Sequence, residues 1–261
     1  AKSGEWWDDE ANGVKRFGYR ALANNSVSYS EKPDMAGFMR EWLALVESKS
    51  GERGIFNREA SRKQAAKNDR RDPYQDFGTN PCSEIILLPY QFCNLTEVVV
   101  RATDTIEDLE RKVRMATILG TIQSTYTKFP YLRKVWQRNT EEERLLGVSL
   151  TGIMDNRLMT HKNQGLDKTL EHLKNVAIST NDELARRLDV PPSAAISCVK
   201  PSGTVSQLVD SASGIHARHS PYYIRTVRGD NKDPLTQFMK DQGIPSEPCV
   251  FKGDTTTVFS F

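Results

Sequence analysis

The sequence has few cysteines, almost no net charge and no long apolar run. Its 261 residues include 4 cysteines, too few for a disulfide scaffold in a chain of this length. No two of them form a CxxC pair, which favours a reducing, cytoplasmic location. The apolar runs have the length of strands and fall well short of the roughly 18 residues that a membrane helix needs. Neither a disulfide-rich secreted protein nor a membrane protein is expected.

The small net charge argues against a nucleic-acid-binding protein. The 36 Lys and Arg residues nearly balance the 34 Asp and Glu residues, for a formal charge of +2. A protein that mainly binds nucleic acid usually needs a basic excess, so direct nucleic-acid binding is not expected. The chain begins at Ala1 without an initiator Met or a signal sequence, and it stops at Phe261 within an apolar alternation. We therefore expect a piece of a longer chain.

Helical and strand-like patterns alternate along the sequence. A 3.6-residue period of apolar positions predicts helices over 34–47, 104–128 and 167–188. Short apolar runs predict strands over 84–88, 95–100, 147–150, 194–200 and 222–227. The charged segment 58–72 lacks a period and is predicted to be a solvated loop or a frayed helix. Strands alternating with long helices indicate an α/β architecture with largely parallel strands.

The densest polar cluster is Gly78-Thr79-Asn80-Pro81-Cys82-Ser83-Glu84, which leads directly into an apolar run. Asn80, Cys82 and Glu84 occupy alternate positions, so in an extended segment they would point to the same side. A thiol between an amide and a carboxylate suits redox or nucleophilic chemistry with an attached acid or base. A turn built on Asn-Pro, with a structural cysteine and an exposed glutamate, is the alternative.

Two further segments are candidates for chemistry. Cys93 follows Cys82 by eleven residues and could approach it across a hairpin, although it could also be an ordinary buried cysteine. Lys200-Pro201-Ser202-Gly203-Thr204-Val205-Ser206 follows a predicted strand and opens a helix, an arrangement that binds anions through backbone N–H groups. Ser202 or Thr204 could instead serve only as the helix N-cap. The 4 histidines suggest no metal site.

Taken together, these motifs resemble the large catalytic chain of ribonucleotide reductases. The resemblance rests on Asn80-Pro81-Cys82-x-Glu84-Ile85, Cys93-Asn94-Leu95, Gly147-Val148-Ser149-Leu150-Thr151-Gly152 and Lys200 to Ser206, in that order. The stretches 147–155 and 220–225 look most like the adenosylcobalamin-dependent (class II, monomeric) ribonucleoside-triphosphate reductases. The similarity runs from about Gly18 to the last residue.

The resemblance implies a fold and a chemistry. The chain would be part of a ten-stranded α/β barrel with a central finger loop, and residues 1–261 would form a single catalytic-barrel domain, truncated at both ends. Cys82 would carry the thiyl radical that takes the 3′ hydrogen of the ribose. Glu84 would act as general base on the 3′ hydroxyl, and Asn80 would bind the sugar. Cys93 would be one member of the redox pair that becomes a disulfide.

It also implies ligands and partners. The residues that would cradle the substrate phosphates are Ser202, Gly203, Thr204, Val205 and Ser206. Residues 18–30 would form the specificity loop, through Asn24, Asn25 and Ser26. The implied cofactor is adenosylcobalamin. The implied partners are a ribonucleoside triphosphate, a deoxynucleotide effector, a thioredoxin-like or dithiol reductant, and missing flanking segments of the same reductase.

The family's pattern leaves two roles without a residue in this sequence. The partner of Cys93 would precede residue 1, and the cysteine pair that re-reduces the site would follow Phe261. Cys198 and Cys249 match neither role and are expected to be structural.

Three alternatives stay open. The chain could belong to the reductases that receive their radical from a separate di-metal subunit, for which Tyr222-Tyr223 could be a relay pair, although that pair lies in a stretch resembling the cobalamin branch. It could be a nucleotide-binding module without catalysis. It could also be one piece of a split reductase.

Overall fold

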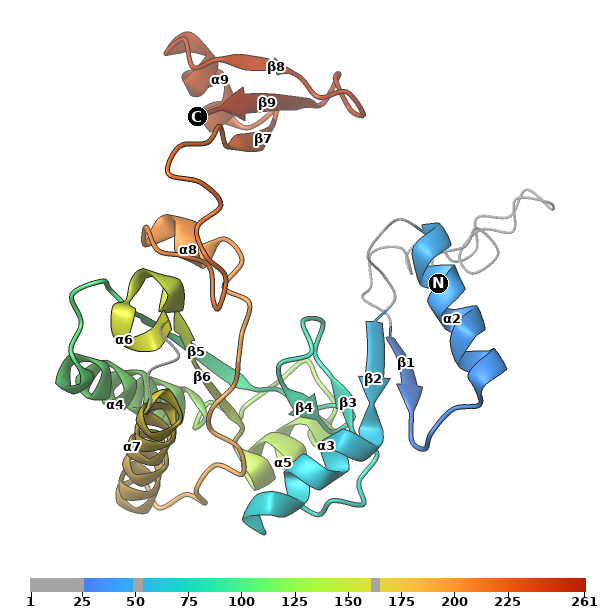
Figure 1. Ribbon diagram of the computed structural model, residues 1–261, viewed down its shortest axis with the longest axis vertical. Helices are drawn as coiled ribbons and strands as arrows, with labels where there is room; N and C mark the ends of the chain where they lie inside the picture. The colour runs from blue at the N-terminus through green and yellow to red at the C-terminus, as the bar shows by residue number, and fades with distance from the viewer. Residues whose placement is uncertain (1–25, 49–53, 161–164) are drawn as a thin grey trace. The chain divides into compact units, whose positions relative to one another are not determined.

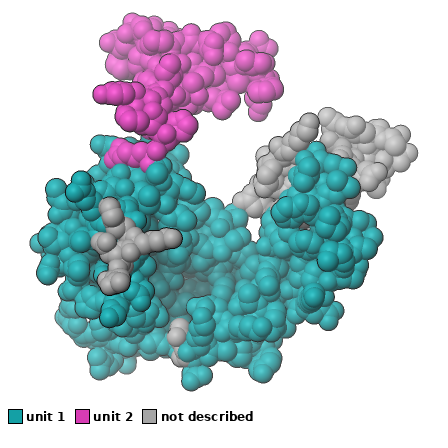
Figure 2. Space-filling model, viewed as in Figure 1, with its two compact units in different colours: residues 1–217 teal, residues 218–261 magenta. Residues whose placement is uncertain are grey.

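The computed structural model describes residues 26–48, 54–160 and 165–261, and Figure 1 shows their course. The chain divides into two compact units, Ala1–Ala217 and Arg218–Phe261 (Figure 2). Asn24 and Asn25 lie outside the described residues. The other residues expected to act on or bind nucleotides belong to the first unit, and Tyr222-Tyr223 belongs to the second.

The first unit mixes short strands with helices of very different lengths. Its strands are β1 (Ser26–Tyr29), β2 (Gly54–Asn57), β3 (Gly78–Thr79), β4 (Ile86–Leu87), β5 (Asn94–Val99) and β6 (Leu146–Thr151). Its helices are α2 (Met35–Ser48), α3 (Arg58–Ala65), α4 (Ile106–Gln123), α5 (Lys134–Glu143), α6 (Arg157–Thr160), α7 (Leu166–Arg187) and α8 (Val205–Leu208). Single 3₁₀ turns lie at Ala66–Asn68 and Ile153–Asp155.

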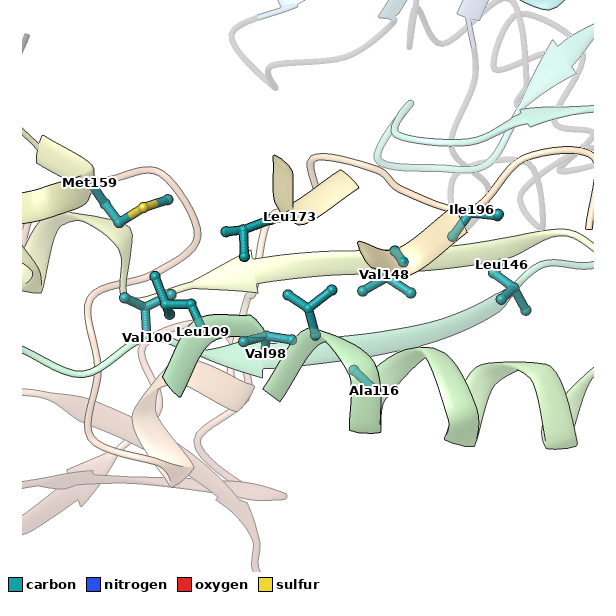
Figure 3. Packing of buried hydrophobic residues seen from close by; sticks show 11 residues of the cluster. Val98, Val100, Leu109, Ala116, Leu146, Val148, Met159, Leu173 and Ile196 are labelled. Atoms are coloured by element: carbon teal, nitrogen blue, oxygen red, sulfur yellow. The ribbon is translucent and has the colours of Figure 1, made fainter. Parts of the chain in front are cut away.

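A parallel strand pair with two long helices forms the core of this unit. β5 and β6 pair in parallel register from Asn94 with Leu146 to Val99 with Thr151. The parallel direction requires the crossover that α4 and α5 provide. Figure 3 shows the buried side chains from both strands meeting those of α4, including Val98, Val148 and Leu109. Leu173 of α7 joins the same cluster.

The helix α4 begins where its sequence predicts. Thr105 is the N-cap, and its hydroxyl accepts a hydrogen bond from the Asp108 N–H while the Asp108 carboxylate accepts one from the Thr105 N–H. This reciprocal capping box satisfies two N–H groups that the first helical turn leaves without partners. One side of the helix then buries Leu109, Val113 and Ala116 against the strands.

A third extended segment lies along the free edge of β6. The N–H groups of Leu146 and Val148 donate to the carbonyls of Ala195 and Ile196 at 3.0 and 2.8 Å. The Cys198 N–H returns a bond of 3.1 Å to the Val148 carbonyl. The segment runs parallel to β6, with one bridge between Val148 and Ser197. It follows α7, so the order strand, helix, strand occurs a second time.

These elements confirm the α/β expectation in its coarse form. The structure contains α2, α4 and α7 within one to five residues of the predicted ends, and β5 and β6 within one residue. The sheets of the described residues have two or three strands each, and none of them closes into a barrel.

Several local predictions are wrong. The segment 58–72 contains the helix α3, as one of its two alternatives predicts, but Ser61, Ala65 and Arg71 in it are buried rather than solvated. The strand expected over 84–88 shrinks to Ile86–Leu87, because the preceding residues form a turn. The strand expected over 194–200 has only the bridge at Ser197. The sequence period missed α5, because that helix buries Thr140 and Glu143 instead of an apolar stripe.

The second unit is a small antiparallel sheet with one helix. Its elements are β7 (Thr226–Asp230), α9 (Pro234–Asp241), β8 (Ser246–Pro248) and β9 (Thr256–Ser260). β9 lies between β7 and β8. β7 begins four residues later than predicted, because its position is set by pairing with β9, from Thr226 with Ser260 to Asp230 with Thr256.

The packing of α4 predicts that truncating two of its leucines to alanine lowers the free energy of unfolding by very different amounts. Leu109 is fully buried, whereas Leu119 is 60% exposed on the same helix. Leu109→Ala should lower the free energy of unfolding by about 2–5 kcal/mol, through lost apolar contacts and the cavity left behind. Leu119→Ala should change it by about 0.5 kcal/mol or less. Urea denaturation followed by circular dichroism measures both, and similar losses in the two variants would contradict this account of the core.

Candidate active site

The polar cluster at 78–84 forms the tip of a short hairpin. β3 and β4 pair antiparallel, Gly78 with Leu87 and Thr79 with Ile86. Inside the turn, the Asn80 side-chain oxygen accepts the Ile85 N–H at 3.1 Å, and the Asn80 carbonyl accepts the Ser83 N–H at 3.0 Å. Ser83 has a positive φ of 64°, which reverses the chain direction within the turn. The hydrogen bonds that Asn80 accepts therefore stabilise the turn at the hairpin tip.

This turn corrects one expectation and separates two side chains. Cys82 and Glu84 do not follow the alternation of an extended strand, because the residues between Asn80 and Ile85 are in the turn. The Cys82 residue is exposed, whereas the Glu84 side chain has no exposed surface. The carboxylate is thus held inside the protein, and the thiol can be reached from outside the chain.

A buried ion pair fixes the hairpin to the rest of the unit. The Arg71 guanidinium donates two parallel hydrogen bonds of 2.7 Å to the Glu143 carboxylate at the end of α5. It also donates to the Ile86 carbonyl of β4 at 3.1 Å. Gln91 bonds the same carboxylate and accepts the Leu88 N–H at 2.8 Å. Arg71, Glu143 and Gln91, which we call the hairpin clamp, therefore hold β4 and the following loop against α5.

Aromatic packing reinforces the clamp. The Phe92 ring stacks on Trp136 of α5 with ring centroids 4.6 Å apart, and it meets Phe129 edge-on at 5.1 Å. Tyr90 lies edge-on against Trp136 at 5.7 Å. Aromatic pairs at these separations add to the burial of apolar area. The chain between β4 and β5, which ends at Cys93, is consequently held on the same helix as the clamp.

The buried carboxylate has a cationic partner. The Lys200 ammonium donates a hydrogen bond of 2.8 Å to Glu84 Oε1. Burial alone raises the pKa of the Glu84 carboxyl, but the nearby polar groups of Lys200, of the backbone and of Asn80 outweigh it, so the pKa is lowered. The hydrogen bond to Glu84 also raises the pKa of Lys200. Glu84 is therefore a carboxylate and Lys200 an ammonium at neutral pH.

Two thiols lie near this ion pair. Burial, and then the charge of Glu84, raises the pKa of Cys93, and the same two causes raise the pKa of Cys198 to about 12. Both residues are therefore neutral thiols in the ordinary pH range. Gly147 of β6 makes room for this arrangement, because a Cβ there would lie 3.2 Å from Cys198 Sγ and would overlap the Leu95 side chain.

The loop from Pro201 to Ser206 differs from its expected form. The helix that it opens, α8, has only 4 residues, so its dipole is weaker than a long helix would supply. Thr204 precedes the helix without a side-chain capping bond. Ser202 is buried, and its hydroxyl has no hydrogen-bond partner among the described residues. The loop thus offers one side chain prepared for a ligand, which is Ser202 rather than the N-cap.

A glycine supports this loop from behind. Gly214 has a φ of +53°, and a Cβ at this position would lie 3.1 Å from the Lys200 carbonyl and 3.5 Å from the Ser202 nitrogen. Its N–H donates to the Thr151 hydroxyl at 2.8 Å, at the end of β6. Both the backbone angle and the close approach favour glycine. The end of β6 therefore positions the main chain of Lys200 and Ser202.

Ser26 is the first residue of the expected specificity loop that the structure describes, and it begins β1. That strand pairs in parallel with β2, from Ser26 with Gly54 to Tyr29 with Asn57. A cavity of about 260 Å³ is lined by Ser26 and Ser28 from β1 and by Asn80 from the hairpin tip. This shared cavity links the two candidate sites.

The sequence did not reveal the three residues of the hairpin clamp or the pairing of Lys200 with Glu84. These contacts join residues 52 to 116 positions apart, so no local spacing could indicate them. Among the described residues, no group of three or more His, Cys, Asp or Glu side chains could hold a metal ion. No helix in the same ranges is long and apolar enough to cross a membrane.

Comparison with solved structures identifies the fold. The chain superimposes on the crystal structure of a B12-dependent (class II) ribonucleotide reductase with a TM-score of 0.72 and 24% sequence identity. The match covers 99% of this chain and 39% of the other. The fold is therefore that of the corresponding part of a class II ribonucleotide reductase.

Among proteins of known function, the chain is similar in sequence to several cobalamin-dependent reductases. The chain is 29% identical to the adenosylcobalamin-dependent ribonucleoside-triphosphate reductase of Lactobacillus acidophilus, and 28% identical to those of Lactobacillus gasseri and Lactobacillus leichmannii. Each match covers 94% of this chain and 36% of the relative, so the chain spans about a third of their length. No family model matches. The resemblance to the cobalamin-dependent reductases is confirmed.

The hairpin clamp gives a prediction about stability. Glu143→Leu leaves the buried Arg71 guanidinium without its carboxylate and should lower the free energy of unfolding by about 3–5 kcal/mol. Replacing both residues, in Arg71→Met/Glu143→Leu, removes the unpaired charge and should restore most of that loss. Urea denaturation of the single and double variants measures this. A double variant as unstable as the single one would show that the unpaired charge is not the cause of the loss.

Proposed function

We propose that this chain carries the active site of an adenosylcobalamin-dependent ribonucleotide reductase, which converts ribonucleoside triphosphates to 2′-deoxyribonucleotides for DNA synthesis. The observation that carries the proposal is the hairpin tip, where an exposed Cys82 thiol lies two residues from the buried, ionised Glu84. The relatives named above support the assignment, since the motif lies within the matched part of the chain.

Cys82, Glu84 and Asn80 of the hairpin each have a separate role at the ribose. A thiyl radical on Cys82 takes the hydrogen atom from C3′ of the ribose, which leaves Cys82 as a thiol and the sugar as a radical. Glu84 accepts the proton of the 3′ hydroxyl, which suits a carboxylate held ionised by Lys200. Asn80 hydrogen-bonds the sugar while the 2′ hydroxyl leaves as water. At the end, Cys82 returns the hydrogen atom to C3′ and becomes a thiyl radical again, and Glu84 returns the proton to the 3′ oxygen.

Cys93 supplies reducing equivalents together with a second cysteine of the complete protein. The pair of thiols gives two hydrogen atoms, one to C2′ and one to the departing water, and becomes a disulfide. The raised pKa of Cys93 suits this role, because the reaction uses hydrogen atoms from neutral thiols rather than a thiolate nucleophile. A thioredoxin-like or dithiol reductant then restores the pair.

The phosphates of the substrate bind at Ser202, Gly203, Thr204, Val205 and Ser206. The buried and unpartnered Ser202 hydroxyl supports this assignment, because such a group gains most from a ligand acceptor. Residues 18–30, with Asn24, Asn25 and Ser26, transmit the identity of a deoxynucleotide effector. The cavity that Ser26 shares with Asn80 supports the last part of that proposal.

Adenosylcobalamin fits the exposed thiol. When bound, this cofactor supplies an organic radical that can take a hydrogen atom from a thiol. Cys82 is the residue that would face it, because the other three cysteines are buried or half-buried and Cys82 is exposed. Within the complete protein, we propose that residues 1–261 belong to one ten-stranded catalytic α/β barrel that acts in the cytoplasm, with the hairpin as its finger loop.

The experiment uses the protein produced from its complete gene, with a ribonucleoside triphosphate and a dithiol. Reduction should require adenosylcobalamin, and Cys82→Ser should abolish it while nucleotide affinity stays within about twofold, because the change removes one reacting atom and no phosphate contact. Cys249→Ser, in the second unit, is the matched control and should keep its activity.

The other outcomes distinguish the alternatives. Activity that needs a di-metal radical subunit instead of the cobalamin would move the protein to the other reductase class and leave the site intact. Nucleotide binding without reduction under either condition would indicate a non-catalytic module.

The support that Gly214 gives to the phosphate loop is also testable. Gly214→Ala adds a side chain against the Lys200 carbonyl and should weaken triphosphate binding by roughly 10-fold or more by displacing Ser202. Gly243→Ala is the control, since Gly243 has a similar φ of +72° with no atom within 4 Å of the added Cβ. Titration calorimetry measures both affinities. Equal affinities in the two variants would contradict the role of Gly214.

A further inference from the structure

Lys200 stands between the two halves of the candidate site. Its ammonium lies 2.8 Å from Glu84 Oε1 on the hairpin, and its main chain begins the loop that contains Ser202. The side chain is only 26% exposed, and the carboxylate that it meets has no exposed surface.

A carboxylate without water around it needs a compensating charge. Burial favours the neutral acid, and an opposite charge within a few ångströms favours the ion. Arg71 lines the same cavity of about 210 Å³ as Glu84, but its guanidinium is paired with Glu143. Lys200 is thus the cation that compensates Glu84.

The other titratable groups that act on the pair or on its neighbours are thiols and one carboxylate. Cys93 and Cys198 both respond to the charge of Glu84, and Cys82 and Cys198 act on Lys200. Glu97 of β5 acts on Cys198. Cys93 and Cys198 have raised pKa values and stay neutral, so neither adds a negative charge beside Glu84.

The hydrogen bond uses one carboxylate oxygen and leaves the other. Lys200 engages Oε1, whereas Oε2 is buried and makes no hydrogen bond. A buried acceptor without a partner is costly, and such groups occur where a ligand or a reacting atom completes them. The pair therefore presents one prepared proton acceptor.

We propose that Lys200 is a positioning residue for the reduction, which holds Glu84 ionised and leaves Oε2 as the atom that accepts the 3′ hydroxyl proton. This inference rests on the proposed function. The packing of the Lys200 main chain against Gly214 supports it, because a fixed backbone restricts where the ammonium can lie.

The first test is the pH profile of kcat in the protein produced from its complete gene. In Lys200→Met the buried Glu84 loses its cation, so its pKa rises and the acid limb of the profile should move up by about one to three pH units. At about pH 6, kcat should then fall roughly 10-fold or more relative to the plateau. Lys200→Arg keeps the charge and should keep the limb near its original position.

The matched control is Lys174→Met, which removes an exposed lysine paired with Glu171 on α7. Its profile should match that of the unmodified protein. A Lys200→Met variant that loses kcat equally at every pH, or that keeps the original limb, would overturn the proposal while leaving the reductase assignment standing.

A second test does not depend on activity. In the unmodified protein the lowered pKa of Glu84 contributes stability above the unfolded-state pKa, and this is lost as pH falls through the folded-state value. In Lys200→Met the raised pKa reverses the sign, so stability is lost as pH rises. The difference in urea midpoint between the two proteins should grow from about pH 4 to pH 7.

The Glu84→Gln background completes this test. There Lys200→Met should produce a difference that does not change over the same pH range, because the titrating carboxyl is gone. A pH-independent difference in the presence of Glu84 would overturn the inference. Absence of reduction in the unmodified protein would instead refute the proposed function, and the stability measurement would still decide whether Lys200 holds Glu84 ionised.

Discussion

The parallel register of β5, β6 and the segment Ala195–Cys198 is the constraint on which the candidate site depends. Cys93 lies just before β5 and Lys200 just after the third segment, so the pairing fixes two residues that are more than a hundred positions apart in the sequence. Gly147 lies in the middle strand, where any side chain would meet Leu95 and Cys198. A slip of one residue would turn every side chain in the pair to the opposite face. The chemistry of the site is therefore fixed by backbone pairing.

Two buried or half-buried ion pairs attach the hairpin to this frame. Arg71 and Glu143 hold its base, and Lys200 and Glu84 hold its tip. Buried pairs of this kind add little net stability compared with apolar residues of the same size, because desolvation offsets the attraction. Their value here is positional, since both join the hairpin to a distant part of the chain. The loss of either partner would leave a charge inside the protein.

Local sequence patterns predicted the elements whose burial is apolar and periodic. α4 and α7 follow a 3.6-residue period, and Thr105 with Asp108 marks the start of α4. α5 was missed because Thr140 and Glu143 form its buried face. The extent of β7 was wrong because its partner β9 lies about thirty residues further along the chain. Non-local pairing and polar burial leave no local period, and this limits any reading of a single sequence.

In the candidate site, too, contiguous motifs could be predicted from the sequence, whereas contacts between distant residues could not. The resemblance indicated Asn80, Cys82, Glu84 and Cys93 from contiguous motifs, and their assigned roles stay predictions. The sequence places Lys200 beside the predicted phosphate loop, but not beside Glu84, because their contact spans 116 positions. Asn24 and Asn25 lie outside the described residues.

The central claim is that the hairpin tip and the Ser202 loop form one substrate site. The most direct measurement is a crystal structure of the protein produced from its complete gene, with a ribonucleoside triphosphate bound. The account predicts phosphates in hydrogen-bond contact with the chain from Ser202 to Ser206, and the ribose against Asn80, Cys82 and Glu84. A nucleotide bound away from both segments would contradict it.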